Sequence, residues 1–383
     1  MRSFTLGEIW DIPIRINTSL IIFLPILAWL IGSGGQIAVY AGFIERLTGV
    51  GFDLAQLRAG SNPWIIGITA AVGLFVSVTI HELGHSWVAL RYGLTIESIT
   101  LWILGGMAAL TSIPREWDRE FWIAIAGPIT SVLVAAVCYV GLLVVPSSLA
   151  VPRFLFGWLA ITNAVLAGFN LLPAFPMDGG RILRALLARR RPYASATRIA
   201  GRIGVVFAFL FAIVGVFTFQ IILLLLAFFV YGAATTESRT VLLDELLTGI
   251  TVGDIATRDV TAVPADTTVE ELGSRMLGER RTVYPVLGEG GRIVGVVSLD
   301  DLKQARKRSR GSDTTGTTVE SVMREVPRVG VGAGAFDTLA LLNQAGSTNA
   351  LVEEDGAVVG VLSQSDYAHA LTIQRGFQSG LGG

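Results

Sequence analysis

An apolar stretch that contains the motif His81-Glu82-Leu83-Gly84-His85 constrains this chain more than any other feature. Residues 64–80 carry no charged side chain, and the apolar run resumes after the motif. As a helix, residues 64–90 would be roughly 40 Å long, which is enough to cross a bilayer. His81 and His85 would share one helix face, with Glu82 flanking it. This is the arrangement of a zinc site whose general base, Glu82, takes a proton from water and passes it to the leaving amine.

The same motif also occurs by accident in soluble proteins, so its setting matters. An ionisable side chain inside a membrane helix costs on the order of 2.5–3.5 kcal/mol or more, and such residues are by default functional. The chain has 3 histidines, and two of them stand in this motif. The sequence therefore favours a metal site over a chance match.

Composition supports a membrane protein. Of 383 residues, 52% are hydrophobic and 15% are charged, which a soluble domain alone does not explain. The net charge of −1 argues against a nucleic-acid partner. Cys138 is the single cysteine, so an intrachain disulfide is impossible. The first apolar run, residues 20–31, lacks a small-residue cleavage site, and we expect a retained helix there rather than a signal peptide.

The hydropathy pattern predicts about six transmembrane helices, at residues 19–31, 64–90, 121–145, 154–170, 203–217 and 219–234. Residues 32–62 form a connection that could include an interfacial segment, and residues 96–110 predict a strand or a re-entrant loop. The arginine-rich loop at residues 181–202 predicts a cytoplasmic position for itself, for both termini and for the C-terminal region.

The fourth predicted helix ends in a segment that cannot continue as a helix. Pro173, Pro176 and Asp178-Gly179-Gly180 follow Asn170. We interpret this segment as backbone unwound at membrane depth beside a cavity, and a simple helix end with a turn is the alternative. A hydrolytic zinc needs a third protein ligand, and we expect a carboxylate because the remaining histidine, His369, lies in the soluble part. Asp178 is the best candidate because it sits in unwound backbone at the end of an apolar helix. Asn170 would donate to an oxyanion or hold a substrate strand, or it would tie off carbonyls freed by the prolines.

From about residue 242 the sequence changes to a soluble α/β pattern that repeats. Tyr284-Pro285-Val286 and the segment Gly295–Asp301 have counterparts about 65 residues later, in Ala350-Leu351-Val352 and the segment Gly360–Asp366. We therefore expect a membrane domain over residues 1–236 and an α/β module over residues 242–383. Its repeats would span about 250–305 and 317–373, joined by a basic linker at residues 306–318.

The two membrane motifs together resemble those of the site-2 protease family of intramembrane zinc metalloproteases, and the resemblance covers roughly residues 1–236. The matching segments are His81-Glu82-Leu83-Gly84-His85 and the stretch from Asn170 to Gly179, NLLPAFPMDG. The resemblance implies zinc held by His81, His85 and Asp178, with Glu82 as base. It also implies cleavage of transmembrane segments of membrane-tethered regulators or anti-sigma factors.

Two further positions follow from this resemblance. Gly105-Gly106 matches the loop that pairs with the substrate strand in the family. The family's glycine-proline motif is commonly followed by asparagine, where this chain has Thr130-Ser131. The polar contact of that asparagine is therefore not carried over to this chain, whereas the chemistry of the site is.

The soluble repeats resemble cystathionine-β-synthase (CBS) domains. In that family a serine or threonine followed three residues later by aspartate can bind an adenine nucleotide such as ATP, ADP or AMP. The matching pairs are Ser298 with Asp301 and Ser363 with Asp366. Alternatively these residues only cap the following helix, or the CBS pair serves homodimerisation without a ligand.

The sequence thus predicts a polytopic α-helical membrane domain with a small β or re-entrant segment, followed by tandem CBS domains. The predicted function is an intramembrane zinc metalloprotease in the cell membrane, modulated by an adenine nucleotide. The alternative is a nucleotide-gated transporter or a metal-dependent scaffold without protease activity, because broken helices also occur at transporter sites.

Overall fold

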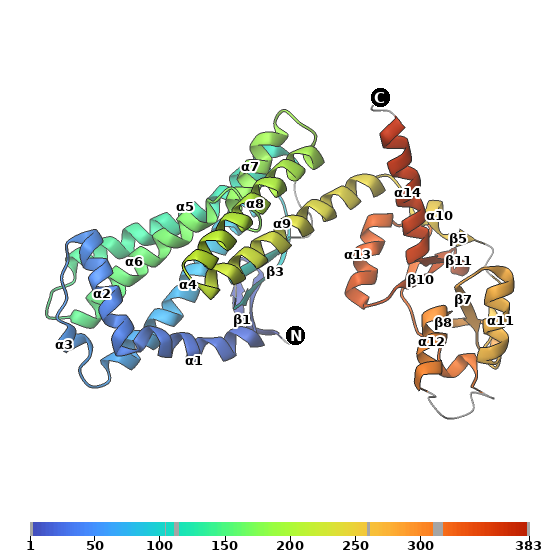
Figure 1. Cartoon of the computed structure of the whole chain (residues 1–383), viewed down its shortest axis with the longest axis horizontal. Coiled ribbons are helices and arrows are strands. Elements are labelled where there is room, and N and C mark those ends of the chain that lie inside the picture. Colours follow the sequence, from blue (N-terminus) through green and yellow to red (C-terminus); the bar gives the residue numbers. More distant parts are fainter. Residues whose placement is uncertain (1–2, 104, 111–114, 259–260, 309–316, 381–383) are drawn as a thin grey trace. The chain divides into compact units, whose positions relative to one another are not determined.

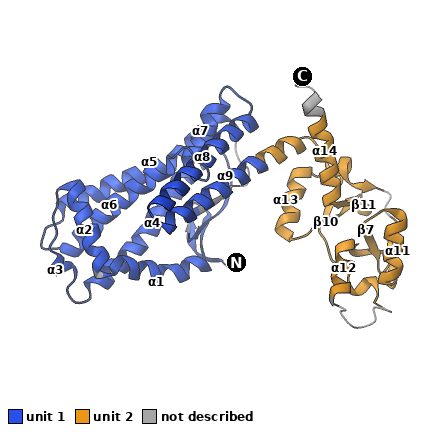
Figure 2. Cartoon of the chain, viewed as in Figure 1, with its two compact units in different colours: residues 1–239 blue, residues 240–383 orange. Residues whose placement is uncertain are grey.

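The computed structural model describes residues 3–103, 105–110, 115–258, 261–308 and 317–380. The chain forms two compact units, Met1–Arg239 and Thr240–Gly383 (Figure 2). The first unit is mainly helical and the second is α/β, which confirms the predicted fold class.

The helices of unit 1 account for most of its residues (Figure 1). They are α1 (Thr18–Gly32), α2 (Gly34–Thr48), α3 (Leu54–Leu57), α4 (Asn62–Arg91), α5 (Trp117–Val144), α6 (Ala150–Asn170), α7 (Asp178–Ala188), α8 (Tyr193–Phe217) and α9 (Ile221–Leu247). By length and composition α4, α5, α6, α8 and α9 can each cross a membrane, and α1 with α2 makes a sixth span if this pair, bent by 69°, is counted as one. The chain is a membrane protein.

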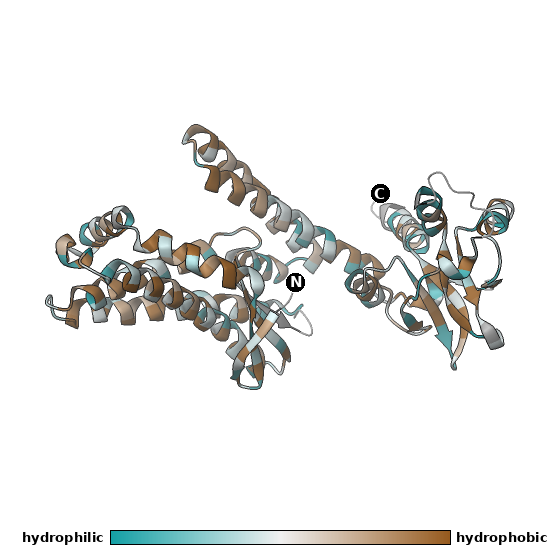
Figure 3. Ribbon diagram, turned by 90° about the horizontal axis from the view of Figure 1, so that it is seen from below, coloured by the Kyte–Doolittle hydropathy of each residue, from teal (hydrophilic) through white to brown (hydrophobic). Residues whose placement is uncertain are grey.

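The surfaces of these helices suit lipid. Figure 3 shows apolar residues along the long helices of unit 1, and large apolar side chains such as Val137 and Phe228 are exposed. Between helices, small residues permit close contact: a Cβ on Gly67 of α4 would lie 2.1 Å from the carbonyl oxygen of Ala28 in α1. Helices in lipid associate through such close packing of small residues.

A four-stranded sheet completes unit 1, in the order β1-β2-β3-β4. Its strands are β1 (Ser3–Ile9), β2 (Ile12–Asn17), β3 (Ile96–Trp102) and β4 (Gly105–Leu110). The strand interpretation of residues 96–110 is therefore right. The N-terminal hairpin was not anticipated, because its turn residues Trp10 and Asp11 adopt positive φ values of 55° and 62° without a glycine to signal them.

Three regions of unit 1 differ from the sequence-based expectation. Residues 32–62, expected to be a connection that could include an interfacial segment, contain the helices α2 and α3. α8 begins at Tyr193, so that Arg198 and Arg202 lie in a helix and not in a loop. α9 continues to Leu247, beyond the expected end at residue 234. Between α6 and α7, residues 171–177 leave the helical path, as the prolines predicted.

Unit 2 contains two small sheets flanked by helices. Its helices are α10 (Val252–Ile255), α11 (Val269–Glu279), α12 (Leu299–Arg308), α13 (Ala335–Ala345) and α14 (Gln364–Gly380), with 3-10 turns η1 (Glu289–Gly291) and η2 (Val319–Ser321). The sheets are β6-β7-β8 and β5-β11-β10-β9. Their strands are β5 (Thr257–Arg258), β6 (Val263–Pro264), β7 (Val283–Leu287), β8 (Ile293–Ser298), β9 (Arg328–Gly330), β10 (Asn349–Glu354) and β11 (Ala357–Ser363).

The two repeats exchange their leading segments. Val252, before the first repeat's own sheet, is fully buried in the core that contains Val329 and Leu362 of the second repeat. Val319, before the second repeat's sheet, is fully buried in the core around Tyr284 of the first. Because each core needs a residue from the other repeat, the repeats fold as one unit. The central part of the expected linker, residues 309–316, lies outside the described residues.

Candidate active site

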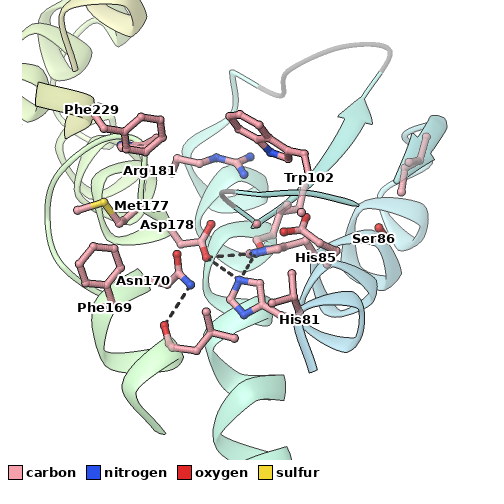
Figure 4. A pocket seen from close by; sticks show the side chains of 18 residues that line it. His81, His85, Ser86, Trp102, Phe169, Asn170, Met177, Asp178, Arg181 and Phe229 are labelled. Atoms are coloured by element: carbon pink, nitrogen blue, oxygen red, sulfur yellow. Dashed lines mark hydrogen bonds and ion pairs between the residues drawn. The ribbon is translucent and has the colours of Figure 1, made fainter. Parts of the chain in front are cut away.

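A cavity of about 400 Å³ in unit 1 is lined by residues of both membrane motifs. The HELGH segment of α4, the strands β3 and β4 and the start of α7 all contribute to its wall (Figure 4). Residues distant in sequence therefore meet around one space large enough for part of a peptide chain.

Three candidate ligand atoms form a small triangle beside this cavity. Asp178 Oδ2 lies 3.1 Å from His81 Nε2 and 3.2 Å from His85 Nε2, and the two Nε2 atoms are 3.1 Å apart. All three residues are buried, and Figure 4 shows the carboxylate directed between the imidazoles. Two ligand atoms on one tetrahedral zinc, each about 2.0–2.1 Å from it, are roughly 3.3 Å apart. The spacing fits a single zinc ion.

Both imidazoles are held from behind. His85 Nδ1 lies 2.7 Å from the carbonyl oxygen of Ile123, which can only accept, so this nitrogen carries the proton. His81 Nδ1 lies 2.8 Å from Ser131 Oγ. In a neutral imidazole with Nδ1 protonated, Nε2 presents a lone pair. The lone pair of His85 Nε2 thus lies beside the Asp178 carboxylate in a buried place, and outer partners of this kind orient metal-binding histidines.

A glycine of α5 packs directly against the imidazoles. A Cβ on Gly127 would lie 2.2 Å from His85 Nε2 and 2.7 Å from His81 Nε2. On α4, a Cβ on Gly84, the residue before His85, would lie 2.6 Å from Oγ1 of Thr130 on α5. The two glycines let α4 and α5 approach closely enough for α5 to close one side of the ligand triangle.

Glu82 lines the same cavity and is half-buried there. Strand β4 passes close to it: a Cβ on Gly106 would lie 2.5 Å from Glu82 Cγ. The neighbouring Gly105 has a φ of 134°, which other residues rarely adopt. The two glycines therefore bring the edge of the sheet against the candidate base without a side chain between them.

Asn170 is the last residue of α6 and lines the cavity. Its Nδ2 donates a hydrogen bond of 3.0 Å to the carbonyl oxygen of Leu166. This bond ties the side chain to its own helix, and the cavity lies beside it (Figure 4).

Two residues near the site were missed in the sequence. Arg181 lines the cavity from the first turn of α7, although its charge was used only to orient the chain. Ser131 contacts His81, so a polar contact is made where the chain departs from the family's asparagine. Its place one helical turn after Gly127 was a usable signal, because residues four apart share a helix face.

In unit 2, Ser363 and Asp366 border a cavity of about 140 Å³. Asp366 Oδ2 accepts bonds of 2.7 Å from both the backbone nitrogen and Oγ of Ser363. Arg280 and Arg281 line the same cavity. A hydroxyl, a carboxylate and two guanidinium groups thus surround one small space.

The matching pair in the first repeat is occupied differently. Asp301 Oδ2 accepts a bond of 3.0 Å from the backbone nitrogen of Ser298, as in the second repeat. Its other oxygen, however, is paired with the guanidinium of Arg324, which also donates to Gln304. Asp301 is buried by this contact. The equivalence seen in the sequence therefore extends to the helix cap but not to the surroundings.

Comparison with known proteins gives consistent matches for both units. The model of peptidase family M50 matches residues 69–152 and 147–211, and the model of the CBS domain matches residues 252–308. A zinc metalloprotease of Methanocaldococcus jannaschii is 35% identical over 305 residues, covering 78% of this chain and 84% of that protein. Rip3 of Mycobacterium tuberculosis, a candidate zinc metalloprotease, is 34% identical and covers 82% of each chain.

Among solved structures, the chain is similar to a site-2 protease from Methanocaldococcus jannaschii. The identity is 35% and the TM-score is 0.42, over 62% of this chain and 96% of that one.

Proposed function

This chain belongs to peptidase family M50, the site-2 proteases, and from that membership we propose which of its residues carry out the reaction. The protein is an intramembrane zinc metalloprotease that hydrolyses peptide bonds within or near transmembrane segments, and it carries a C-terminal CBS region. The convergence of two imidazoles and one carboxylate beside a cavity is the observation on which the assignment of residues rests.

We propose that His81, His85 and Asp178 hold the zinc, with Ser131 and the Ile123 carbonyl orienting the imidazoles. When bound, zinc lowers the pKa of a water molecule and polarises the scissile carbonyl. Three protein ligands leave a position open, as hydrolysis requires.

Glu82 is the proposed general base. Its carboxylate takes a proton from the attacking water and delivers it to the leaving amine, so one group serves both halves of the reaction. Its position in the same cavity as the ligands supports this role. Asn170, also in the cavity wall, is the proposed donor to the oxyanion.

The substrate is proposed to bind as an extended strand along β4. That strand lies at the edge of its sheet, and Gly105-Gly106 brings its backbone next to Glu82 without a side chain between them. Strand addition at such an edge satisfies the peptide's backbone groups. Because a helix bonds its amides internally, the substrate must unwind first, which favours segments with Gly, Ala, Ser or Pro near the cut.

An adenine nucleotide is proposed to bind at Ser363 and Asp366, where Arg280 and Arg281 would meet its phosphates. Each aspartate already has a partner on its second oxygen, Thr257 for Asp366 and Arg324 for Asp301. The choice of Asp366 therefore rests on the two arginines that line its cavity. The substrate class is a membrane-tethered regulator such as an anti-sigma factor. We propose that the N-terminus, the C-terminus and the CBS domains lie in the cytoplasm, because the arginines at residues 181–202 favour that side of the membrane. The CBS pair is a candidate homodimer contact.

The decisive experiment compares Glu82→Gln with Glu97→Gln, an exposed carboxylate of β3, in the full chain reconstituted with a single-span substrate. Glu82→Gln is expected to keep its zinc and to lose about 10²–10⁴-fold in cleavage rate, whereas Glu97→Gln keeps both. If Glu82→Gln cuts at the wild-type rate, Glu82 is not the base. If the wild-type chain leaves every substrate intact, a transporter or scaffold is favoured.

The nucleotide site is tested by calorimetric titration with ATP, ADP and AMP. Asp366→Ala is expected to remove binding, whereas the matched Ser298→Ala retains it. Absence of heat with all three nucleotides in the wild-type chain removes the proposal.

A further inference from the structure

A buried arginine lies at the junction of three helices in unit 1. Arg184 of α7 is 1% exposed. Its Nε donates a 2.8 Å bond to Glu120 Oε1 at the start of α5, and its Nη1 pairs with Glu237 of α9. Its guanidinium also lies 5.0 Å from the ring of Phe175 and 4.9 Å from that of Tyr193. One planar fork thus meets two carboxylates and two aromatic rings.

Stability alone is a weak reason for this arrangement. Replacement of a buried ion pair by apolar residues of similar volume is often neutral or stabilising, because both charges must be desolvated. A buried fork with fixed partners does, however, select one relative position of the segments that carry them. Arg184 therefore specifies how α7 sits against α5 and α9.

The segment so fixed carries the metal ligand. Asp178 is the first residue of α7, less than two helical turns before Arg184. Phe175, against the guanidinium, belongs to the non-helical segment that leads into Asp178. Arg184 therefore contacts the chain on both sides of Asp178, and a shift of the guanidinium moves the carboxylate as well.

The third arm of the junction is on the helix that leaves the unit. Beside Glu237, a Cβ on Gly201 of α8 would lie 2.1 Å from Ser238 Oγ, and one on Gly204 would lie 3.0 Å from Ala234 Cβ. α9 is thus held closely at residues 234–238. It then continues as a helix to Leu247, past the boundary between the units at Arg239.

We propose that Arg184 is a positioning residue for Asp178, and that its bond to Glu237 makes the metal centre sensitive to the position of α9. The inference rests on the proposed role of Asp178 as a zinc ligand. A displacement of α9 removes Glu237 from the guanidinium of Arg184. Of the two carboxylates that hold α7, and with it Asp178, in position, only Glu120 then remains. Unit 2 begins on the same helix. It is thereby connected to the proposed zinc site through contacts within unit 1.

The test measures zinc affinity of the full-length protein by competition with a chromophoric chelator, together with the thermal midpoint of unfolding. Glu237→Gln keeps the Arg184–Glu120 pair and is expected to fold, and its zinc affinity should fall about tenfold. The matched control is Glu245→Gln, an exposed carboxylate further along α9, which should change neither quantity. A purely structural role predicts the opposite, a lower midpoint with unchanged zinc affinity.

Arg184→Met alone leaves Glu120 buried without a partner and could fail to fold, so Arg184→Met combined with Glu120→Gln removes both charges. This double variant is expected to fold and to bind zinc at least tenfold more weakly than the wild type. Arg184→Lys as a single substitution should bind zinc more tightly than the double variant and more weakly than the wild type. Wild-type zinc affinity in both Glu237→Gln and the double variant overturns the inference alone. A wild-type chain that holds no zinc overturns the proposed function and the inference with it.

Discussion

Replacement of Gly127 by alanine tests the metal centre with a single methyl group. The new Cβ would lie 2.2 Å from His85 Nε2, 2.5 Å from His85 Cε1 and 2.7 Å from His81 Nε2. Each separation is below 3.0 Å, which carbon atoms essentially never approach. The variant therefore forces a movement of the proposed ligand atoms themselves.

The size of this movement follows from the geometry. His85 Nε2 must retreat by about 0.8 Å to reach even 3.0 Å, whereas metal–ligand distances tolerate roughly 0.2 Å. Rotation of the ring is opposed by the bond from His85 Nδ1 to Ile123. We expect the zinc affinity of Gly127→Ala to fall by at least the 10–100-fold typical of losing an outer contact, and peptide cleavage to fall with it.

The assay is zinc content and competitive zinc titration of the purified full chain, followed by cleavage of a reconstituted substrate. The matched control is Gly42→Ala in α2, where an added Cβ meets nothing within 4 Å. Alanine is a better helix former than glycine by roughly 0.5–1 kcal/mol, so this control should keep its zinc and its thermal midpoint or raise the midpoint slightly. If Gly127→Ala binds zinc as the wild type does, the nitrogen atoms beside Gly127 are not the ligands and the proposed centre is wrong.

Three further predictions address the surroundings of the site and the soluble unit. Ser131→Ala removes the partner of His81 Nδ1 and should weaken zinc binding about tenfold; an unchanged affinity would show that Ser131 does not orient the ring. Gly106→Ala places a Cβ 2.5 Å from Glu82 Cγ and should reduce cleavage while zinc content stays at the wild-type level; loss of zinc would contradict this separation of base and ligands. Burial raises the pKa of Tyr367 to about 12, above its unfolded value of about 10, so this residue stabilises the fold fully below pH 10, and the contribution is lost as the pH rises towards 12. Between pH 10 and pH 12 the thermal midpoint of unfolding should fall less for Tyr367→Phe than for the wild type. An equal fall in both would show that Tyr367 does not cause the loss of stability.

The sequence predicted the chemical elements of the site because their signals are local. Histidines four apart on an apolar helix share a face whatever surrounds them. Prolines after Asn170 break a helix because proline lacks an amide proton. The strand alternative for residues 96–110 and the two-unit fold class also followed from local pattern and composition.

What the sequence did not reveal depends on contacts between distant segments. The close approach of Gly127 to both imidazoles depends on the packing of α5 against α4. No residue spacing within either helix predicts this packing. Arg184 looked like one of several arginines in a basic loop, and only its two carboxylate partners, Glu120 and Glu237, distinguish it. The hairpin turn at Trp10 and Asp11 was hidden for a different reason, since residues other than glycine adopt its positive φ values.

The difference between the two Ser–Asp pairs of unit 2 has a consequence for how the protein would report on its environment. Because Arg280 and Arg281 line the cavity that Asp366 borders, whereas Arg324 pairs with Asp301, the proposed nucleotide site occurs once in each polypeptide. The dose–response to an effector should then be hyperbolic, with a stoichiometry of one per polypeptide and a Hill coefficient near unity. Any steeper response would have to arise from association of several molecules. The shape of the titration curve therefore distinguishes independent binding by a monomer from cooperative binding by an oligomer.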